Sequence, residues 1–137
     1  MKKLVTFMFA VVAVTLAGAN EAAQVTERKV DLYSEGTRLG GTVFYVQPPE
    51  GEKLPAIIMS HGWGGTASML RPQAERFANA GYFVLAFDYR GWGESNARWV
   101  RNEAESGAQT GRRELREVVH PVDQATDIAN AVHWVMG

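Results

Sequence analysis

The feature that most constrains the fold is a short apolar segment that runs into a glycine-rich turn. Residues 56–59 (Ala-Ile-Ile-Met) form a continuous apolar run, which is typical of a buried strand. A turn with three glycines, residues 61–65 (His-Gly-Trp-Gly-Gly), follows, and a helical pattern begins a few residues later. Glycine permits positive φ angles and close approach of a ligand to the backbone. This order aims backbone N–H groups at an anion, either a phosphate or a developing oxyanion.

A second strand and turn follow along the chain. Residues 69–80 place apolar side chains at helical spacing, and Gly81 is expected to end that helix in a left-handed conformation. Residues 82–87 are apolar throughout and predict a buried strand, which ends at a second glycine turn, residues 88–95 (Asp-Tyr-Arg-Gly-Trp-Gly-Glu-Ser). Two strands joined through a helix by short links predict a right-handed βαβ unit with parallel strands.

The flanking segments complete the expected order of elements. Alternating patterns over residues 25–34 and 39–46 predict a hairpin. Residues 96–120 are polar and predict a long surface excursion with one helical turn at Glu114 to Val118; it either borders a binding site or is a solvated insertion. Pro121 is favoured at the first position of a last helix.

That last helix carries an apolar stripe at helical spacing. The stripe comprises Ala125, Ile128, Ala129, Val132, Val135 and Met136. The spacing predicts an amphipathic helix with one face packed on the sheet.

The amino terminus has the pattern of a secretory signal. Lys2 and Lys3 are followed by a mainly apolar region of 13 residues, 4–16, and then by the small residues Ala-Gly-Ala at 17–19. Thirteen residues are too few for a hydrocarbon core that needs about 20. We therefore expect a signal peptide over residues 1–19, cleaved after Ala19, a domain over residues 25–137, and a secreted or periplasmic protein without a stable membrane anchor. An uncleaved anchor is the alternative.

Composition excludes several classes of protein. The chain has 14 basic and 15 acidic residues, which argues against a nucleic-acid binder because such proteins need a basic excess. It has no cysteine, so it has no disulfide, thiolate metal site or thiol nucleophile.

Together, the hairpin, the turn at residues 61–65, the turn at residues 88–95 and the helix from Pro121 resemble the amino-terminal half of an α/β-hydrolase. They are most similar to bacterial dienelactone-hydrolase-like and Xaa-Pro-dipeptidyl-peptidase-like members. The resemblance implies a β-hairpin followed by a parallel βαβα arrangement, with the three-layer sandwich left incomplete. It also implies a serine hydrolase that acts on a small-molecule or peptide acyl substrate (ester, peptide or lactone) and needs no cofactor or metal.

The resemblance assigns roles to residues of both turns. The backbone N–H of Trp63 would form half of the oxyanion hole. The His61 ring would pin the first turn, although a general-base role is an alternative, and Asp88 would pair with Arg90 to brace the second. The turn-supporting residues are then His61, Gly62, Gly64, Gly65, Asp88 and Arg90.

The chain departs from the family at the nucleophile. It contains no Gly-x-Ser-x-Gly elbow. Ser60 and Ser95 match the elbow only in part, and Ser95 is interpreted as a turn residue. His120 and His133 are interpreted as surface and helix-end residues. We therefore expect an amino-terminal fragment that lacks nucleophile, acid and base and is inactive alone.

Two other interpretations remain open. Gly62-x-Gly64, with Asp88 26 positions after Gly62, also fits a Rossmann-like dinucleotide-binding domain. In the second of these interpretations, the chain is a non-catalytic or incomplete product.

The family's strand order makes a further prediction. The hairpin should pair through its second strand with residues 82–87, and these with residues 55–60. Residues 56–59 would then form an open, uncharged edge, a template for self-association. The last helix would be partly uncovered, which would expose Ile128 or Val132.

Overall fold

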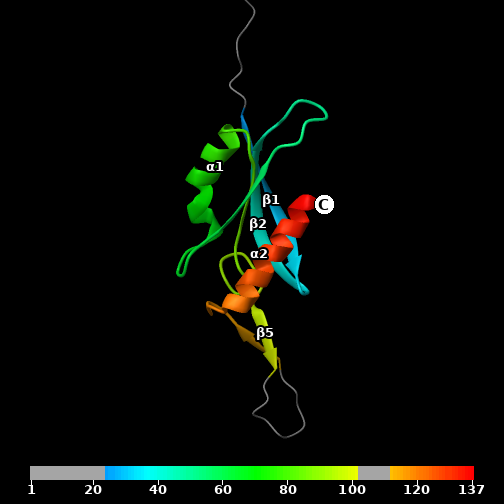
Figure 1. The fold of residues 1–137 in the computed structure, drawn as a ribbon. Helices are drawn as coiled ribbons and strands as arrows, with labels where there is room; N and C mark the ends of the chain where they lie inside the picture. Colours follow the sequence, from blue (N-terminus) through cyan, green and yellow to red (C-terminus); the bar gives the residue numbers. More distant parts are fainter. Residues whose placement is uncertain (1–23, 102–111) are drawn as a thin grey trace, which may run out of the picture.

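The computed structural model describes residues 24–101 and 112–137. The signal peptide expected at residues 1–19 therefore lies outside the described part of the chain. The elements, drawn in Figure 1, are β1 (Val25–Ser34), β2 (Thr37–Val46), β3 (Ala56–Ser60), the 3₁₀ helix η1 (Ala67–Leu70), α1 (Arg71–Asn79), β4 (Phe83–Phe87), β5 (Arg98–Arg101), β6 (Arg112–Leu115) and α2 (Pro121–Met136). None of the described helices is long and apolar enough to cross a membrane.

Four strands form one mixed sheet in the predicted order, β1-β2-β4-β3. The hairpin β1–β2 is antiparallel, and β2 pairs antiparallel with β4. β3 pairs parallel with β4, with Ile58 opposite Leu85, so the expected βαβ unit is confirmed. β3 is an edge of the sheet among the described residues.

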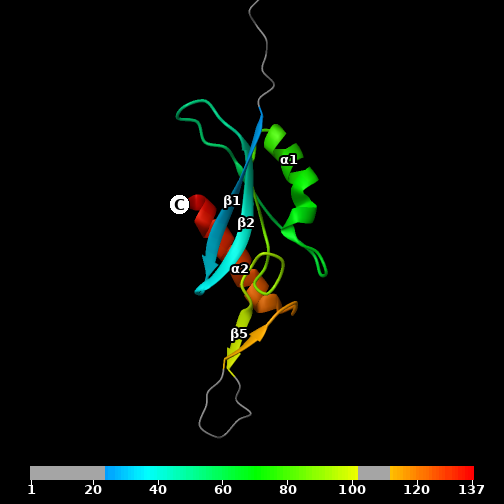
Figure 2. The same ribbon diagram turned by 180° about the vertical axis from the view of Figure 1, so that it is seen from behind.

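The two faces of the sheet carry separate cores because successive side chains of a strand point to opposite faces. One core joins Val43 and Leu85 to Ala131 of α2. The other joins Phe44 and Val84 to Ala74 and Ala78 of α1. Both helices thus meet the sheet through alanines, whose small side chains allow close approach. In Figures 1 and 2, α1 and α2 lie on either side of the strands.

The first helical segment is divided between η1 and α1, rather than forming one helix over residues 69–80. Pro72 falls in the first turn of α1, where an N–H group lacks an intrahelical partner in any case. Gly81 has φ +91°, and its N–H donates to the carbonyl of Ala78 at 3.0 Å, which confirms the left-handed end of the helix.

The polar excursion is partly a strand pair, which corrects the expected helical turn. β5 and β6 form an antiparallel ribbon with Trp99 opposite Glu114. Glu117 has φ +56° and donates its N–H to the carbonyl of Gly91 at 2.9 Å. The hydrogen bonds between β5 and β6, and the bond from Glu117 to Gly91, take the place of the local hydrogen bonds that a helical turn would make. Residues 102–111 lie outside the described part.

The last helix begins at Pro121 as predicted, but its rotation differs from expectation. Asp127 and Ala131 are buried, whereas most of the apolar stripe faces outward. Ile128 is 39% exposed, Val132 38% and Met136 79%. The predicted exposure of Ile128 and Val132 is therefore confirmed, and only Val135 of the stripe packs against the core beneath α2.

Candidate functional site

The first glycine turn lies at the carboxyl end of β3. The Gly65 N–H donates to the carbonyl of Gly62 at 3.1 Å, and Gly64 has φ +76° at the third position. A turn with this geometry requires glycine there. Trp63 occupies the second position, and the residue is 86% exposed. Its N–H has no acceptor among residues 24–101 and 112–137.

The three glycines of the turn have different roles. Gly64 is required by its positive φ angle. A methyl group on Gly65 would lie 3.3 Å from the carbonyl oxygen of Gly62 and from Cβ of His61, which is tighter than ordinary van der Waals contact. A methyl group on Gly62 would meet nothing within 4 Å. Gly62 is therefore not needed for the turn's own geometry.

The His61 ring supports the turn from beneath. Its side chain is 3% exposed, and Nδ1 lies 2.9 Å from the carbonyl oxygen of Gly62, so Nδ1–H is the donor. The ring packs against Tyr89 and Trp92, with centroids 5.2 and 5.6 Å away. Nε2 lies 3.6 Å from Asp88 Oδ1 without a hydrogen-bond partner among the described residues. These contacts agree with a pinning role, and they give no support to a general-base role.

Asp88 connects the two glycine turns. Its Oδ1 accepts the N–H of Ala67 at 2.6 Å, just after the first turn, and its Oδ2 accepts the N–H of Glu94 at 2.9 Å in the second. The residue is 4% exposed. A side chain on Gly93 would collide with this carboxylate, and Gly93 also has φ +47°. The carboxylate therefore fixes the position of one turn relative to the other.

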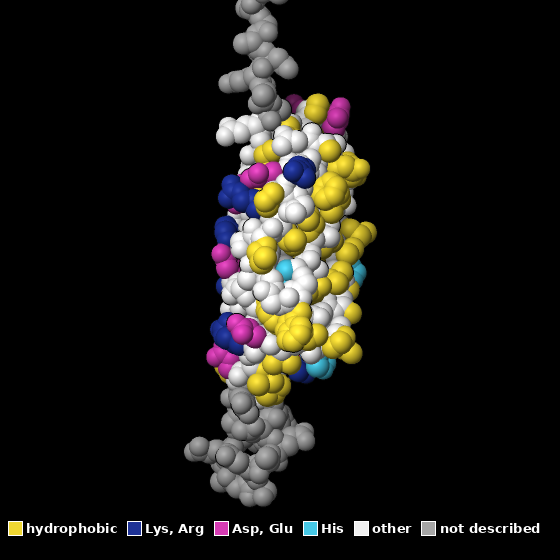
Figure 3. All heavy atoms as spheres, turned by 90° about the vertical axis from the view of Figure 1, so that its left-hand side faces the viewer, with side chains coloured by type: hydrophobic (Ala, Val, Ile, Leu, Met, Phe, Trp, Pro, Cys, Tyr) yellow, Lys and Arg dark blue, Asp and Glu magenta, His cyan; other side chains and the backbone are white. Residues whose placement is uncertain are grey.

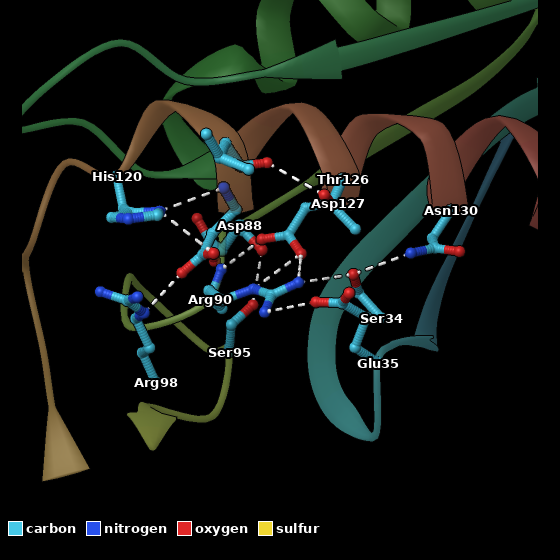
Figure 4. Close-up of polar contacts among 12 residues, drawn as sticks. Ser34, Glu35, Asp88, Arg90, Ser95, Arg98, His120, Thr126, Asp127 and Asn130 are labelled. Carbon is cyan, nitrogen blue, oxygen red and sulfur yellow. Dashed lines mark hydrogen bonds and ion pairs between the residues drawn. The ribbon is translucent and has the colours of Figure 1, made fainter. Parts of the chain in front are cut away.

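Arg90 does not pair with Asp88 as expected. Its partner is Asp127 of α2, as Figure 4 shows. Asp127 Oδ1 accepts from Arg90 Nη2 at 2.6 Å and from Nε at 2.9 Å, and its Oδ2 accepts the Arg90 N–H at 3.1 Å. Arg90 also donates to Ser34 Oγ at 2.8 Å and to Glu35 Oε2 at 3.1 Å. The guanidinium thus joins the second turn, the end of β1 and α2.

The electrostatics of Arg90 follow from these contacts. Burial by itself lowers the pKa of its guanidinium, but the hydrogen bonds and charge of Asp127, with a hydrogen bond to Glu35, outweigh burial and raise the pKa above its ordinary value. Asp127 is fully buried and must face Arg90. This pairing explains the rotation of α2, because residues of the apolar stripe lie on the side of the helix away from Asp127.

Sequence reasoning missed Asp127. The signal was present: Asp123 and Asp127 are the only acidic residues of α2 and lie one turn apart on one side. The helix can pack on the sheet either with the face that carries these two acids or with the face that carries the apolar stripe. Only an identified partner, here 37 positions away along the chain, decides between the two faces.

No hydrogen bond links a serine to a histidine among the candidate residues Ser60, Ser95, His120 and His133. Ser95 is 2% exposed, donates Oγ–H to the carbonyl of Asp88 at 2.6 Å and accepts the Gly40 N–H at 2.9 Å, as expected of a turn residue. Ser60 Oγ lies 2.6 Å from the Tyr89 hydroxyl. His120 precedes α2 as its N-cap, and His133 is exposed in the last turn.

A metal site is also missing from the described residues, where no three His, Cys, Asp or Glu side chains lie close enough to hold an ion. The carboxylate of Asp123 is already paired with two side chains. Arg98 Nε lies 2.6 Å from Asp123 Oδ2, and His120 Nδ1 lies 3.1 Å from Asp123 Oδ1.

Comparison with known proteins agrees with this geometry. The family described as serine aminopeptidase, S33, matches residues 51–133. An uncharacterized 31.7 kDa protein of Escherichia coli is 34% identical over 81% of this chain and 31% of its own. The quorum-quenching protein AidA of Acinetobacter baumannii is 35% identical over 54% of this chain and 25% of its own.

Solved structures show the same fold. A hypothetical protein from Pseudomonas aeruginosa superposes with a TM-score of 0.61 at 24% identity, over 98% of this chain and 36% of its own. The α/β hydrolase GrgF from Penicillium superposes with a TM-score of 0.58 at 25% identity, over 80% of this chain and 32% of its own. The chain thus spans about a third of the length of these structures and of the Escherichia coli relative. With its glycine turns and its sheet order, it belongs to the serine aminopeptidase S33 family of the α/β-hydrolase superfamily and has an incomplete form of that fold.

Proposed function

We propose that this chain supplies the oxyanion turn of an acyl hydrolase that acts on an ester, peptide or lactone. The observation that carries the proposal is the Trp63 N–H, which lies in a glycine turn at the end of β3 without an acceptor among the described residues. Acyl transfer builds negative charge on a carbonyl oxygen, and a fixed N–H donor stabilises that charge. Loss of one such donor raises the barrier by about 2.7–4 kcal/mol in a known case.

The supports of the turn favour this role. A donor is effective only if it is held in place before the charge develops. His61 and Asp88 hold the two sides of the turn through partly buried hydrogen bonds with Gly62 and Ala67. Residues 61–66, with Met69 and Leu70, line an open hollow of about 270 Å³, so an acyl group has access to the turn. The structural relative named as an α/β hydrolase supports a hydrolytic role.

We further propose that these 137 residues do not hydrolyse an ester by themselves. They contain no Gly-x-Ser-x-Gly elbow. The two serines that match it in part, Ser60 and Ser95, are bonded to Tyr89 and to the backbone of Asp88. In this proposal, the nucleophile, acid and base belong to polypeptide outside the 137 residues.

Export through a cleaved signal remains a proposal that rests on residues 1–19 alone. The dinucleotide-binding alternative gains no support, because the Asp88 carboxylate is buried and already accepts two N–H groups. It is not positioned to bind a ribose.

Labelling with a fluorophosphonate tests the absence of a nucleophile. We expect no covalent adduct by intact-mass analysis and no turnover of an activated ester above buffer. Any adduct is located by peptide mapping, with Ser60→Ala and Ser95→Ala as matched variants. An adduct on wild-type chain that disappears in one of these variants would identify a nucleophile and overturn the proposal.

A further inference from the structure

The ladder between β2 and β4 ends in an unusual way. Gly41 lies opposite Phe87, the last residue of β4, so the next opposite pair is Gly40 and Asp88. The two residues of a hydrogen-bonded pair in an antiparallel sheet normally exchange both N–H···O=C bonds. One of these bonds is made, because the Asp88 N–H donates to the carbonyl of Gly40 at 2.9 Å. The Gly40 N–H donates instead to Ser95 Oγ, also at 2.9 Å.

The Ser95 hydroxyl takes the place of the second bond. Its Oγ accepts the Gly40 N–H and donates a proton to the carbonyl of Asp88 at 2.6 Å. One hydroxyl is therefore inserted between a donor and an acceptor that would otherwise meet. Both hydrogen bonds are buried, so water does not compete for either partner. The insertion keeps the carbonyl of Asp88 further from β2 than its N–H.

The strand β2 has room for the turn that brings Ser95 to this place. A side chain on Gly40 would put its Cβ 2.8 Å from Cβ of Glu94, so glycine allows the second turn to lie against the strand. The Asn96 N–H donates to the carbonyl of Arg38 at 2.9 Å, and Arg38 Nη2 donates to the carbonyl of Glu94 at 2.8 Å. Both neighbours of Ser95 in the chain are thus bonded to β2.

Surface charge is a weaker contact between the same elements. Lys29 Nζ lies 2.6 Å from Glu94 Oε1, but the two side chains are 65% and 61% exposed. Figure 3 shows basic and acidic side chains lying together along one side of the surface. Exposed ion pairs of this kind contribute little, because water and salt screen them. The buried hydroxyl of Ser95 is therefore the contact that fixes the second turn on β2.

The Asp88 side chain transmits the position of its backbone to the first turn. Its Oδ1 accepts the Ala67 N–H at 2.6 Å, and its Oδ2 accepts the Glu94 N–H at 2.9 Å. Ala67 begins η1, directly after the turn that carries Trp63. A change in the Asp88 backbone therefore moves the acceptor of the Ala67 N–H, and with it one end of the turn.

We propose that Ser95 is a positioning residue of the oxyanion turn. Its hydroxyl opens the β2–β4 ladder at Gly40 and so sets where the Asp88 carboxylate holds Ala67. This role rests on the proposed function for the group that is positioned, the Trp63 N–H. A serine that serves only its own turn needs no partner in β2, whereas Ser95 binds the backbone of Gly40.

Amide-resolved hydrogen exchange tests the role of the hydroxyl. Ser95→Ala should speed exchange of the Ala67 amide at least about tenfold more than exchange of Val84, a buried residue of β4, because a hydrogen bond to a carboxylate is strong. Ser34→Ala removes another fully buried hydroxyl and is the matched control, which should leave the ratio of the two rates unchanged. An equal increase at Ala67 and Val84, or the same ratio in the control, would show a purely structural role and overturn the proposal.

A double substitution tests whether Ser95 acts through Asp88. Asp88→Asn replaces one carboxylate oxygen with an amino group that cannot accept an N–H, so it should also speed exchange at Ala67. Adding Ser95→Ala should then have little further effect. Full additivity of the two substitutions would mean that Ser95 acts by another route, against the proposal.

The wild-type chain provides a test that requires no variant to fold. Scalar coupling across hydrogen bonds should join the Asp88 nitrogen to the carbonyl carbon of Gly40, but not the Gly40 nitrogen to the carbonyl carbon of Asp88. Coupling in both directions would show a closed ladder and refute the insertion. These measurements use no anion. A Trp63 amide that fails to bind methylphosphonate would contradict the proposed function, whereas the rates at Ala67 decide the role of Ser95.

Discussion

The buried pair of Arg90 and Asp127 gives a large and specific stability prediction. Asp127 is fully buried and accepts three hydrogen bonds, all from Arg90. Asp127→Ala would leave the guanidinium, whose side chain is 9% exposed, with only Ser34 and the exposed Glu35 as partners. Breaking a buried pair in this way costs about 3–5 kcal/mol, and a whole domain has only about 5–15 kcal/mol of stability.

The assay is urea unfolding followed by circular dichroism. We expect Asp127→Ala to lower the free energy of unfolding by about 3–5 kcal/mol, and Arg90→Met with Asp127→Leu to recover much of that loss, because apolar replacement of both partners is often neutral. Arg71→Ala is the control: it removes exposed ion pairs with Glu27 and Glu75, and should cost no more than about 1 kcal/mol. A loss below about 1 kcal/mol for Asp127→Ala, or strict additivity of the two sites, would refute this reasoning.

Other predictions concern the turn and the amino terminus. Gly64→Ala, at φ +76°, should destabilise the chain by about 1–2 kcal/mol in urea unfolding, whereas Gly62→Ala, which meets no neighbour, should cost less; equal losses would contradict the assigned turn geometry. Amino-terminal sequencing of the exported protein should begin at Asn20, and a membrane-bound chain that still begins at Met1 would exclude cleavage of the signal.

Local sequence patterns predicted the elements that depend on neighbouring residues. The hairpin, the parallel pair β3–β4, the left-handed Gly81 and the start of α2 at Pro121 each follow from residue spacing or from the conformational limits of glycine and proline. The strand order then followed from the family resemblance, and it correctly placed β3 at the end of the four-stranded sheet that residues 24–101 form.

Long-range pairing was the part that sequence patterns did not predict. The antiparallel ribbon of β5 and β6 depends on partners across a long connection. The rotation of α2 depends on a charge pair between residues 37 positions apart, and the apolar stripe alone points to the opposite choice. The contacts that support the site were also not predicted from sequence patterns, since Asp88 binds Ala67 and Glu94 rather than Arg90.

The central claim is that the Trp63 N–H is an unoccupied donor for an oxyanion, and an amide-resolved titration tests it most directly. Two-dimensional ¹⁵N–¹H spectra of the chain are recorded as methylphosphonate, a tetrahedral anion, is added. We expect the Trp63 amide signal to move downfield and saturate, and Gly64→Ala to abolish the response. A Trp63 amide that does not respond, or a response centred on amides away from residues 61–66, would contradict the claim.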